Sequence, residues 1–185
     1  MGTRGMAGDS PAGERLSLWM ATSYPLWYTA LTRDARCDVC LVGAGIAGLS
    51  TAYLLCLAGR DVIVLDSGPI GGGMTGRTTA HLSFPLDDRY YELERQIGLE
   101  GMKHAAESHR VAVDCIETIV NREHLDCDFV RLDGYLFTPP GEGDQELREE
   151  FGAAQRAGVP GVRMVARAPL TAFDTGSALL FPNQG

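Results

Sequence analysis

The chain has 185 residues, of which 45% are hydrophobic and 22% are charged. This composition is that of a soluble globular protein of one or two domains, and it excludes a disordered or fibrous chain. The net charge of -8 argues against nucleic acid as a partner. Because no apolar run approaches the roughly 18 residues of a membrane helix and the N-terminus lacks signal-peptide features, we predict a cytoplasmic protein without a membrane partner.

Residues 1–36 lack a regular pattern and are predicted to form an N-terminal arm, with disorder over about the first ten residues. The arm contains an aromatic patch. The patch is either a binding surface or a set of side chains that pack on the main domain, and the second interpretation is favoured. Its members are Trp19, Tyr24, Trp27 and Tyr28.

The chain contains five cysteines, an odd number in scattered positions, so reduced thiols are expected rather than disulfides. Cys37 and Cys40 have the spacing of a redox motif or of half a zinc site. The pair enters a predicted strand rather than a helix N-terminus, and no second pair stands at zinc-site spacing. We therefore interpret both cysteines as small buried hydrophobic residues and predict no metal site.

Residues 39–66 contain a glycine turn between a short apolar strand and an amphipathic helix. In this turn Gly43 permits the tight bend, Gly45 lets the backbone approach a pyrophosphate, and Gly48 lets the helix pack closely on the strand. The apolar run at residues 62–65 predicts a parallel strand that is buried on both faces. Together these elements have the layout of a dinucleotide-binding strand-helix-strand unit.

The start of this helix and the acid after the second strand are the predicted ligand groups. The unpaired N–H groups of the first helical turn, which contains Ile46 and Ala47, suit a doubly charged pyrophosphate. Asp66 stands about twenty residues after the glycines, as expected of an acid that accepts hydrogen bonds from a ribose hydroxyl, and Ser67 follows it. The spacing therefore predicts an adenine dinucleotide.

Residues 68–81 form a segment that is too rich in glycine for regular structure and also rich in hydroxyl groups. Its backbone N–H groups can lie directly against a flat or anionic ligand. Thr75, Thr78 and Thr79 offer hydroxyls, and Arg77 offers a forked donor suited to phosphate. A mobile surface loop is the alternative, but ligand contact is favoured because ligands bind beyond the carboxyl ends of such strands.

Two helices are expected next, over residues 86–97 and 102–120, with a break at Gly98 and Gly101. Three histidines in or near this region lack the carboxylate and imidazole neighbours of a ligand cluster, so we interpret them as structural or solvated. They are His104, His109 and His124.

From residue 127 the pattern changes to strand. An Asp-Gly pair between two short apolar runs predicts a β-hairpin over about residues 127–138. The remaining expected elements are a helix over about residues 145–157 and strands at 162–166 and 178–181.

Three runs, at residues 38–50, 75–81 and 127–137, together resemble the FAD-dependent oxidoreductases of the D-amino-acid oxidase and glycine oxidase family. The resemblance covers most of the chain from about Trp19 onward, and is greatest to a bacterial branch whose members often carry a C-terminal Rieske domain. It implies an α/β fold with a Rossmann-like FAD-binding unit and the beginning of an α+β substrate domain. Residues 37–185 are then an FAD-binding domain with a partial substrate-domain insertion, truncated at the C-terminus, because family members are much longer.

The resemblance also implies which residues hold the cofactor. In the family the glycine turn and the acid hold the ADP half of FAD, and the threonine-rich loop runs beside the pyrophosphate and the ring. Some relatives attach FAD through a loop histidine, but Thr78 stands at that position and His81 lies three residues later, so noncovalent FAD is expected. The implied cofactor-binding residues are Gly43, Gly45, Ile46, Ala47, Gly48, Asp66, Ser67, Thr75, Arg77, Thr78, Thr79 and His81.

The activity implied by the resemblance is hydride transfer from a C–H bond of an amine or amino acid to the flavin. No catalytic residue is named, because the flavin carries the chemistry and the family's substrate-binding residues lie in a part that is absent here. Two alternatives stay open: an NAD-dependent dehydrogenase, which the strand-helix-strand unit alone permits, and a catalytically inactive FAD-binding fragment. The expected partner is a small-molecule amine or amino acid, with a completing chain or a homo-oligomer left open.

Overall fold

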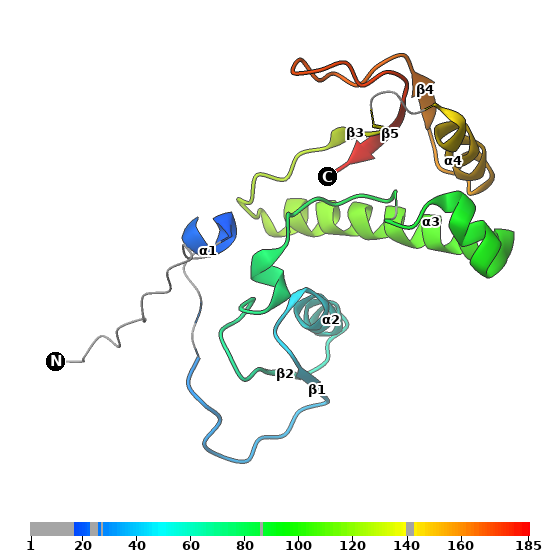
Figure 1. Ribbon diagram of the computed structural model, residues 1–185. Coiled ribbons are helices and arrows are strands. Elements are labelled where there is room, and N and C mark those ends of the chain that lie inside the picture. The colour runs from blue at the N-terminus through cyan, green and yellow to red at the C-terminus, as the bar shows by residue number, and fades with distance from the viewer. Residues whose placement is uncertain (1–16, 23–25, 27, 86, 140–142) are drawn as a thin grey trace. The chain divides into compact units, whose positions relative to one another are not determined.

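The computed structural model describes residues 17–22, 26, 28–85, 87–139 and 143–185, and the chain divides into two compact units, residues 1–80 and 81–185 (Figure 1). Both units contain helices and strands, so the predicted α/β class is confirmed at that level. None of the helices in the described part of the chain is long and apolar enough to cross a membrane. The predicted division at residue 36 stays a prediction.

The first unit contains a two-stranded parallel sheet and one helix that connects its strands. Strand β1 (Val39–Val42) pairs in parallel with β2 (Val62–Leu65), and α2 (Ile46–Leu57) lies between them in sequence and packs on both. The predicted order of strand, turn, helix and strand is therefore confirmed. All four side chains of β2 are half-buried, so the predicted burial on both faces is only partial.

The arm contains a short helix where the sequence predicted no regular structure. Helix α1 (Leu18–Thr22) begins directly after Ser17, whose hydroxyl accepts a hydrogen bond from the Met20 N–H group at 3.2 Å. This contact is the usual capping interaction of a serine before a helix. The first ten residues, Tyr24 and Trp27 lie outside the described residues.

The second unit is built on a long helix with a break at the predicted place. Helix α3 (Tyr90–Glu123) is interrupted at Gly98, whose φ of 75° and ψ of 170° are readily adopted only by glycine. Gly101 continues the helix, so the break involves one glycine rather than two. Residue 86 of the predicted apolar stripe lies outside the described residues. The fully buried side chains on α3 are Tyr90, Met102, Ala106 and Val113.

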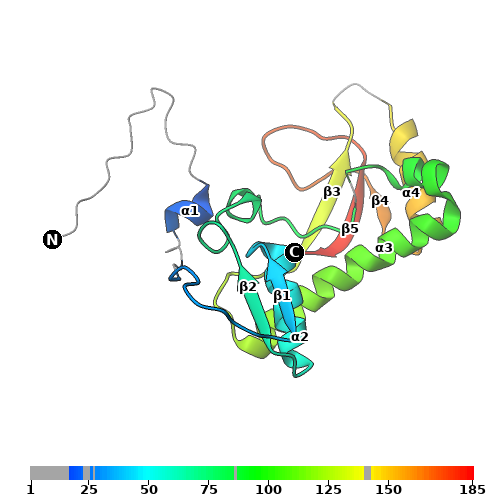
Figure 2. The ribbon, with the colours of Figure 1, turned by 90° about the horizontal axis from the view of Figure 1, so that it is seen from below.

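A three-stranded antiparallel sheet completes this unit. Strand β5 (Ala178–Gln184) lies between β3 (Leu132–Phe137) and β4 (Arg163–Val165), as Figure 2 shows. Helix α4 (Gln145–Arg156) packs beside α3 and contacts β5. The predicted helix and the two later strands are thus confirmed to within a few residues.

The predicted hairpin over residues 127–138 is wrong. Asp133 and Gly134 do not form a turn but lie inside β3, where the pairing with β5 shifts register between Leu132 and Gly134. Residues 127–131 form no strand. Pairing with β5 outweighs the local turn preference, because it places β3 beside a buried strand whose Leu179 and Phe181 side chains lie in the core.

The core of the second unit joins α3, α4 and the sheet. A buried carboxylate on α4 lies within it: Glu150 is 2% exposed and accepts hydrogen bonds from the N–H groups of Tyr90 at 3.1 Å and Tyr91 at 3.3 Å. These amides belong to the first turn of α3, which has no intrahelical acceptors for them. The Tyr90 hydroxyl in turn donates to the Phe84 carbonyl oxygen at 2.5 Å.

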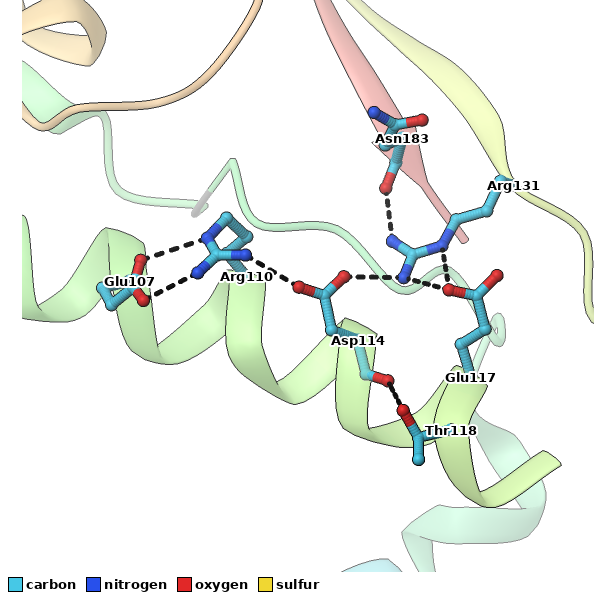
Figure 3. Close-up of polar contacts among 7 residues, drawn as sticks. All are labelled: Glu107, Arg110, Asp114, Glu117, Thr118, Arg131 and Asn183. Atoms are coloured by element: carbon cyan, nitrogen blue, oxygen red, sulfur yellow. Dashed lines mark hydrogen bonds and ion pairs between the residues drawn. The ribbon is translucent and has the colours of Figure 1, made fainter. Parts of the chain in front are cut away.

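An ion-pair network fixes the segment before β3 to α3 (Figure 3). The Arg131 guanidinium donates to Asp114 and Glu117, each at 2.8 Å, and to the Asn183 carbonyl oxygen at 2.7 Å. Asp114 also accepts from Arg110 at 2.8 Å. Because one guanidinium contacts both elements, this network links the C-terminal half of α3 to β5.

Candidate functional site

The glycine turn of the first unit has the backbone geometry predicted for it. Gly43 has a φ of 106°, a conformation that side chains other than glycine rarely adopt. Its N–H group donates to the Leu65 carbonyl oxygen at 2.7 Å, which holds the turn against the end of β2. Gly71 donates to the Ala44 carbonyl oxygen at 2.9 Å, so the loop after β2 also contacts the turn.

Gly48 allows the helix to approach the turn, whereas the sequence predicted close packing on the strand before it. A Cβ atom at this position would lie 1.9 Å from the carbonyl oxygen of Gly43, a distance that no real contact reaches. The obstructing atom belongs to the backbone, so a side chain here forces the helix and the turn apart. Close packing of α2 on the turn therefore depends on glycine at residue 48.

Asp66 fixes the turn from the end of β2. Its Oδ2 atom accepts a hydrogen bond from the Ala44 N–H group at 2.6 Å, and Oδ1 accepts from the Gly68 N–H group at 2.8 Å. The Ala44 bond, followed by the Gly68 bond, holds the pKa of the exposed Asp66 carboxyl below its ordinary value of 3.8. The sequence did not predict this backbone role. A carboxylate has about four lone-pair positions, so both oxygens keep capacity for a further donor such as a ribose hydroxyl.

The threonine-rich loop reaches the start of α2 through one hydroxyl. Thr75 lies in a short 3₁₀ helix, η1 (Met74–Arg77), and its Oγ1 atom accepts a hydrogen bond from the Ile46 N–H group at 3.1 Å. A Cβ atom on Gly45 would lie 3.1 Å from the same oxygen. The second glycine of the turn thus makes room for Thr75, in addition to the ligand approach that the sequence predicted for it.

These groups surround one open cavity of about 730 Å³ in the first unit. It unites the turn, the start of α2, the acid and the loop, which are separate in the sequence. Eight of the predicted cofactor-binding residues line it. They are Gly43, Gly45, Ile46, Ala47, Gly48, Asp66, Thr75 and Thr78.

Four predicted site residues do not line this cavity. The Arg77 guanidinium donates through Nη1 to the carbonyl oxygens of Gly72 at 3.2 Å and Gly73 at 3.1 Å, so it supports the loop backbone. Ser67 and Thr79 are exposed, and His81 belongs to the second unit. Their roles toward a ligand stay predictions.

The cavity also contains residues that the sequence did not single out. Val42 ends β1 directly before the turn and is 88% exposed, and Met74 begins η1 and is 80% exposed. The signal for Val42 was its place at the carboxyl end of a parallel strand, where ligands bind in such sheets. Met74 offered no comparable signal, because only the folded loop brings it to the turn.

In the part of the chain that the structure describes, the cysteine and histidine residues form no metal cluster. Cys40 is exposed on β1 and Cys37 is half-buried, so the interpretation of both as buried hydrophobic residues is wrong. All five cysteines are free thiols. Within the described ranges, no group of three or more histidine, cysteine or acidic side chains lies close enough to hold a metal ion.

Comparison with known proteins assigns a family to this arrangement. Residues 38–185 match the family described as DAO, FAD dependent oxidoreductase. A Bacillus subtilis relative, named as the Rieske 2Fe-2S iron-sulfur protein YhfW, is 32% identical over 155 residues, which are 83% of this chain and 30% of that protein. No solved structure matches the chain.

Two further relatives are oxidoreductases by name. Gamma-glutamylputrescine oxidoreductase of Escherichia coli is 31% identical, and the oxidoreductase OrdL of Haemophilus influenzae is 28% identical, each over 102 residues. Each match covers 55% of this chain and 24% of the relative. The chain therefore spans less than a third of the length of these relatives. With a family match over most of its residues, the chain belongs to the FAD-dependent oxidoreductases of the DAO family.

Proposed function

We propose that this chain is the cofactor-binding portion of an oxidoreductase that transfers hydride from a C–H bond of an amine or amino acid to FAD. The observation that carries the proposal is the single cavity that unites the glycine turn, the start of α2, Asp66 and Thr75. Its strand-helix-strand frame is interpreted as the Rossmann-like unit of an FAD-binding domain. The amine substrate class comes from the name of one relative, gamma-glutamylputrescine oxidoreductase.

The residues around the cavity fit an adenine dinucleotide. Gly43 and Gly45 present backbone without side chains, and the first turn of α2 presents N–H groups at the positive end of the helix. Because Thr75 accepts from the Ile46 amide, we assign the pyrophosphate to the amides of Ala47 and Gly48. Asp66 is assigned to a ribose hydroxyl of the adenosine, since the hydrogen bonds that it accepts keep it ionised.

FAD, when bound, supplies the hydride acceptor. The residues of this chain would bind and orient the dinucleotide: backbone amides would donate hydrogen bonds to the phosphates, and Asp66 would accept a hydrogen bond from the ribose. The loop around Thr75 contacts the start of α2. None of the described residues in the cavity has the pairing of an acid and a base that proton transfer needs. Because the chain matches less than a third of its longer relatives, we assign substrate binding to the parts of those relatives that lie outside the match.

We further propose that FAD is held without a covalent bond. Thr78 lines the cavity at the position where the family resemblance places an attachment histidine in some relatives. A threonine hydroxyl does not form the covalent bond to the flavin that an imidazole forms. Acid precipitation of the loaded protein is expected to release all flavin into the supernatant. Flavin that stays with the precipitate would contradict this assignment.

The proposal is tested by titrating the purified chain with FAD and, separately, with NAD. We expect flavin binding with weak affinity, seen as a change in flavin absorbance and fluorescence, and little turnover with amines or amino acids. NAD binding without flavin binding would overturn the cofactor assignment. Rapid amine oxidation by the 185 residues alone would overturn the assignment of substrate binding to other residues.

A second candidate function, an FAD-binding module that another chain completes, is favoured by the exposed apolar side chains of α2. Ile46 is 57% exposed, Leu54 50% and Leu57 45%, and no side chain of α2 is buried. Exposed apolar faces of this kind usually contact other protein. The test is sedimentation of the FAD-loaded chain. If it sediments as a monomer and its FAD affinity does not depend on protein concentration, a second copy of the chain does not complete the module.

A further inference from the structure

The arm helix α1 contacts the threonine-rich loop through two hydrogen bonds to backbone carbonyl oxygens. The Trp19 indole Nε1 donates to the Thr78 carbonyl oxygen at 2.7 Å, and the Ser17 hydroxyl donates to the carbonyl oxygen of Gly76. Ser17 also accepts from the Met20 N–H group, so the same hydroxyl starts the helix and fixes it to the loop. Both loop carbonyls lie within three residues after Thr75.

Apolar side chains of α1 also lie beside the loop. A cavity of about 560 Å³ lies between α1 and the loop, with Trp19 and Met20 on one side and Gly72, Thr75 and Thr78 on the other. At Gly76 a Cβ atom would lie 3.3 Å from the Met20 side chain, so Met20 lies close to the loop backbone. The two directional hydrogen bonds, together with this packing, hold the loop against α1.

The position of the loop matters for the cofactor cavity. Thr75, one residue before Gly76, accepts from the Ile46 amide at the start of α2 and lines the cavity together with Thr78. A displacement of residues 76–78 therefore moves both threonines relative to the glycine turn. The loop is further supported from within by Arg77, which donates hydrogen bonds to the carbonyl oxygens of Gly72 and Gly73.

We propose that α1 holds the cofactor-binding loop in place, and that Trp19 and Ser17 are positioning residues for FAD. This inference rests on the proposed function. The contact between α1 and the loop increases the fraction of molecules in which Thr75 and Thr78 lie at the cavity. When that fraction falls, the apparent dissociation constant for FAD rises. Neither residue lines the cofactor cavity itself, so the effect on FAD passes through the loop.

The test compares the FAD dissociation constants of the wild-type chain and of Trp19→Phe, which keeps an aromatic ring but removes the indole donor. Loss of one such hydrogen bond is expected to raise the dissociation constant about threefold to tenfold. Ser17→Ala is expected to have a similar effect. Ser17→Thr, which keeps the hydroxyl, is expected to bind FAD with wild-type affinity. Leu18→Ala is the matched control, because this side chain lies on the same helix, is 64% exposed and lines no described cavity.

Amide hydrogen exchange separates positioning from a merely structural role. In the FAD-free Trp19→Phe variant, exchange of residues 71–79 is expected to rise, while FAD suppresses it again. A variant that melts at a lower temperature but binds FAD with wild-type affinity overturns the inference and leaves the proposed function intact. Failure of the wild-type chain to bind FAD instead overturns the proposed function and this inference with it.

Discussion

Asp66 and Glu150 make the same kind of contact in the two units, and their pKa values move in opposite directions. Each carboxylate accepts hydrogen bonds from two backbone N–H groups, at 2.6 and 2.8 Å for Asp66 and at 3.1 and 3.3 Å for Glu150. The amides of Ala44 and Gly68 lower the pKa of the exposed Asp66 carboxyl. Burial raises the pKa of Glu150, and its hydrogen bonds only oppose that effect.

The difference reflects how each unit is stabilised. The first unit holds its glycine turn by backbone hydrogen bonds at a solvent-exposed groove, and Ala44 is its one fully buried hydrophobic residue among those described. The second unit has a continuous core of aromatic and aliphatic side chains from α3, α4 and the sheet. Ligand binding is therefore expected to stabilise the first unit, whereas the second depends on its own packing.

The largest expected effect is the loss of a core side chain. Leu147 is 2% exposed on α4, so Leu147→Ala is expected to reduce the free energy of unfolding by about 2–5 kcal/mol. The matched substitution in the first unit, Leu54→Ala on a side chain that is 50% exposed, is expected to cost less than about 1 kcal/mol. Urea unfolding followed by circular dichroism measures both. Equal losses would contradict the contrast between the units.

The next effect tests the turn. Gly48→Ala places a Cβ atom 1.9 Å from the Gly43 carbonyl oxygen, so we expect a loss of about 1–3 kcal/mol in stability and a marked fall in FAD affinity. The control is Gly152→Ala in α4, where the new atom meets only the flexible end of Arg156 at 3.3 Å. This substitution is expected to stabilise the helix by about 0.5–1 kcal/mol. Calorimetric melting and FAD titration distinguish the two glycines, and unchanged FAD binding by Gly48→Ala would refute the role of close packing.

A smaller effect is the pH dependence of the second unit's stability. Burial raises the pKa of Glu150 above its ordinary value of 4.5, so the native state binds a proton that the unfolded chain releases. This contribution to stability is fully present below pH 4.5 and is lost as the pH rises through the native pKa. Glu150→Gln, which keeps one acceptor oxygen, is expected to flatten the dependence. Parallel pH curves for the two proteins, measured by urea midpoints, would exclude Glu150 as the cause.

The smallest expected effect has the opposite sign and belongs to the first unit. The pKa of Asp66 is lowered in the native state, so its contribution is present above the ordinary value of 3.8 and is lost as the pH falls through the native pKa. In Asp66→Asn this acid sensitivity is expected to disappear. Thermal midpoints measured between pH 3 and pH 5 test it: the wild-type curve is expected to fall toward the variant curve at the acid end and to run parallel to it at higher pH.

Several local elements followed from the sequence because their causes are local. The positive φ of Gly43 and the break at Gly98 are backbone conformations that glycine adopts easily, so the residue type itself indicates them. The strand-helix-strand order, α4 and the last two strands followed from hydrophobic periodicity. Eight of the twelve predicted site residues line one cavity: five belong to the glycine motif, and Asp66, Thr75 and Thr78 follow β2, which pairs with the strand before the turn.

Contacts between distant residues were decided only by the tertiary structure. The Asp133-Gly134 pair favours a turn, yet β3 runs through it because pairing with β5, more than forty residues later, buries Leu179 and Phe181. The Thr75 hydroxyl on the Ile46 amide and the Glu150 carboxylate on the start of α3 join residues 29 and about 60 positions apart. Residue type and spacing determine which conformations and ligands a segment favours, but which donor meets which acceptor depends on how the elements pack.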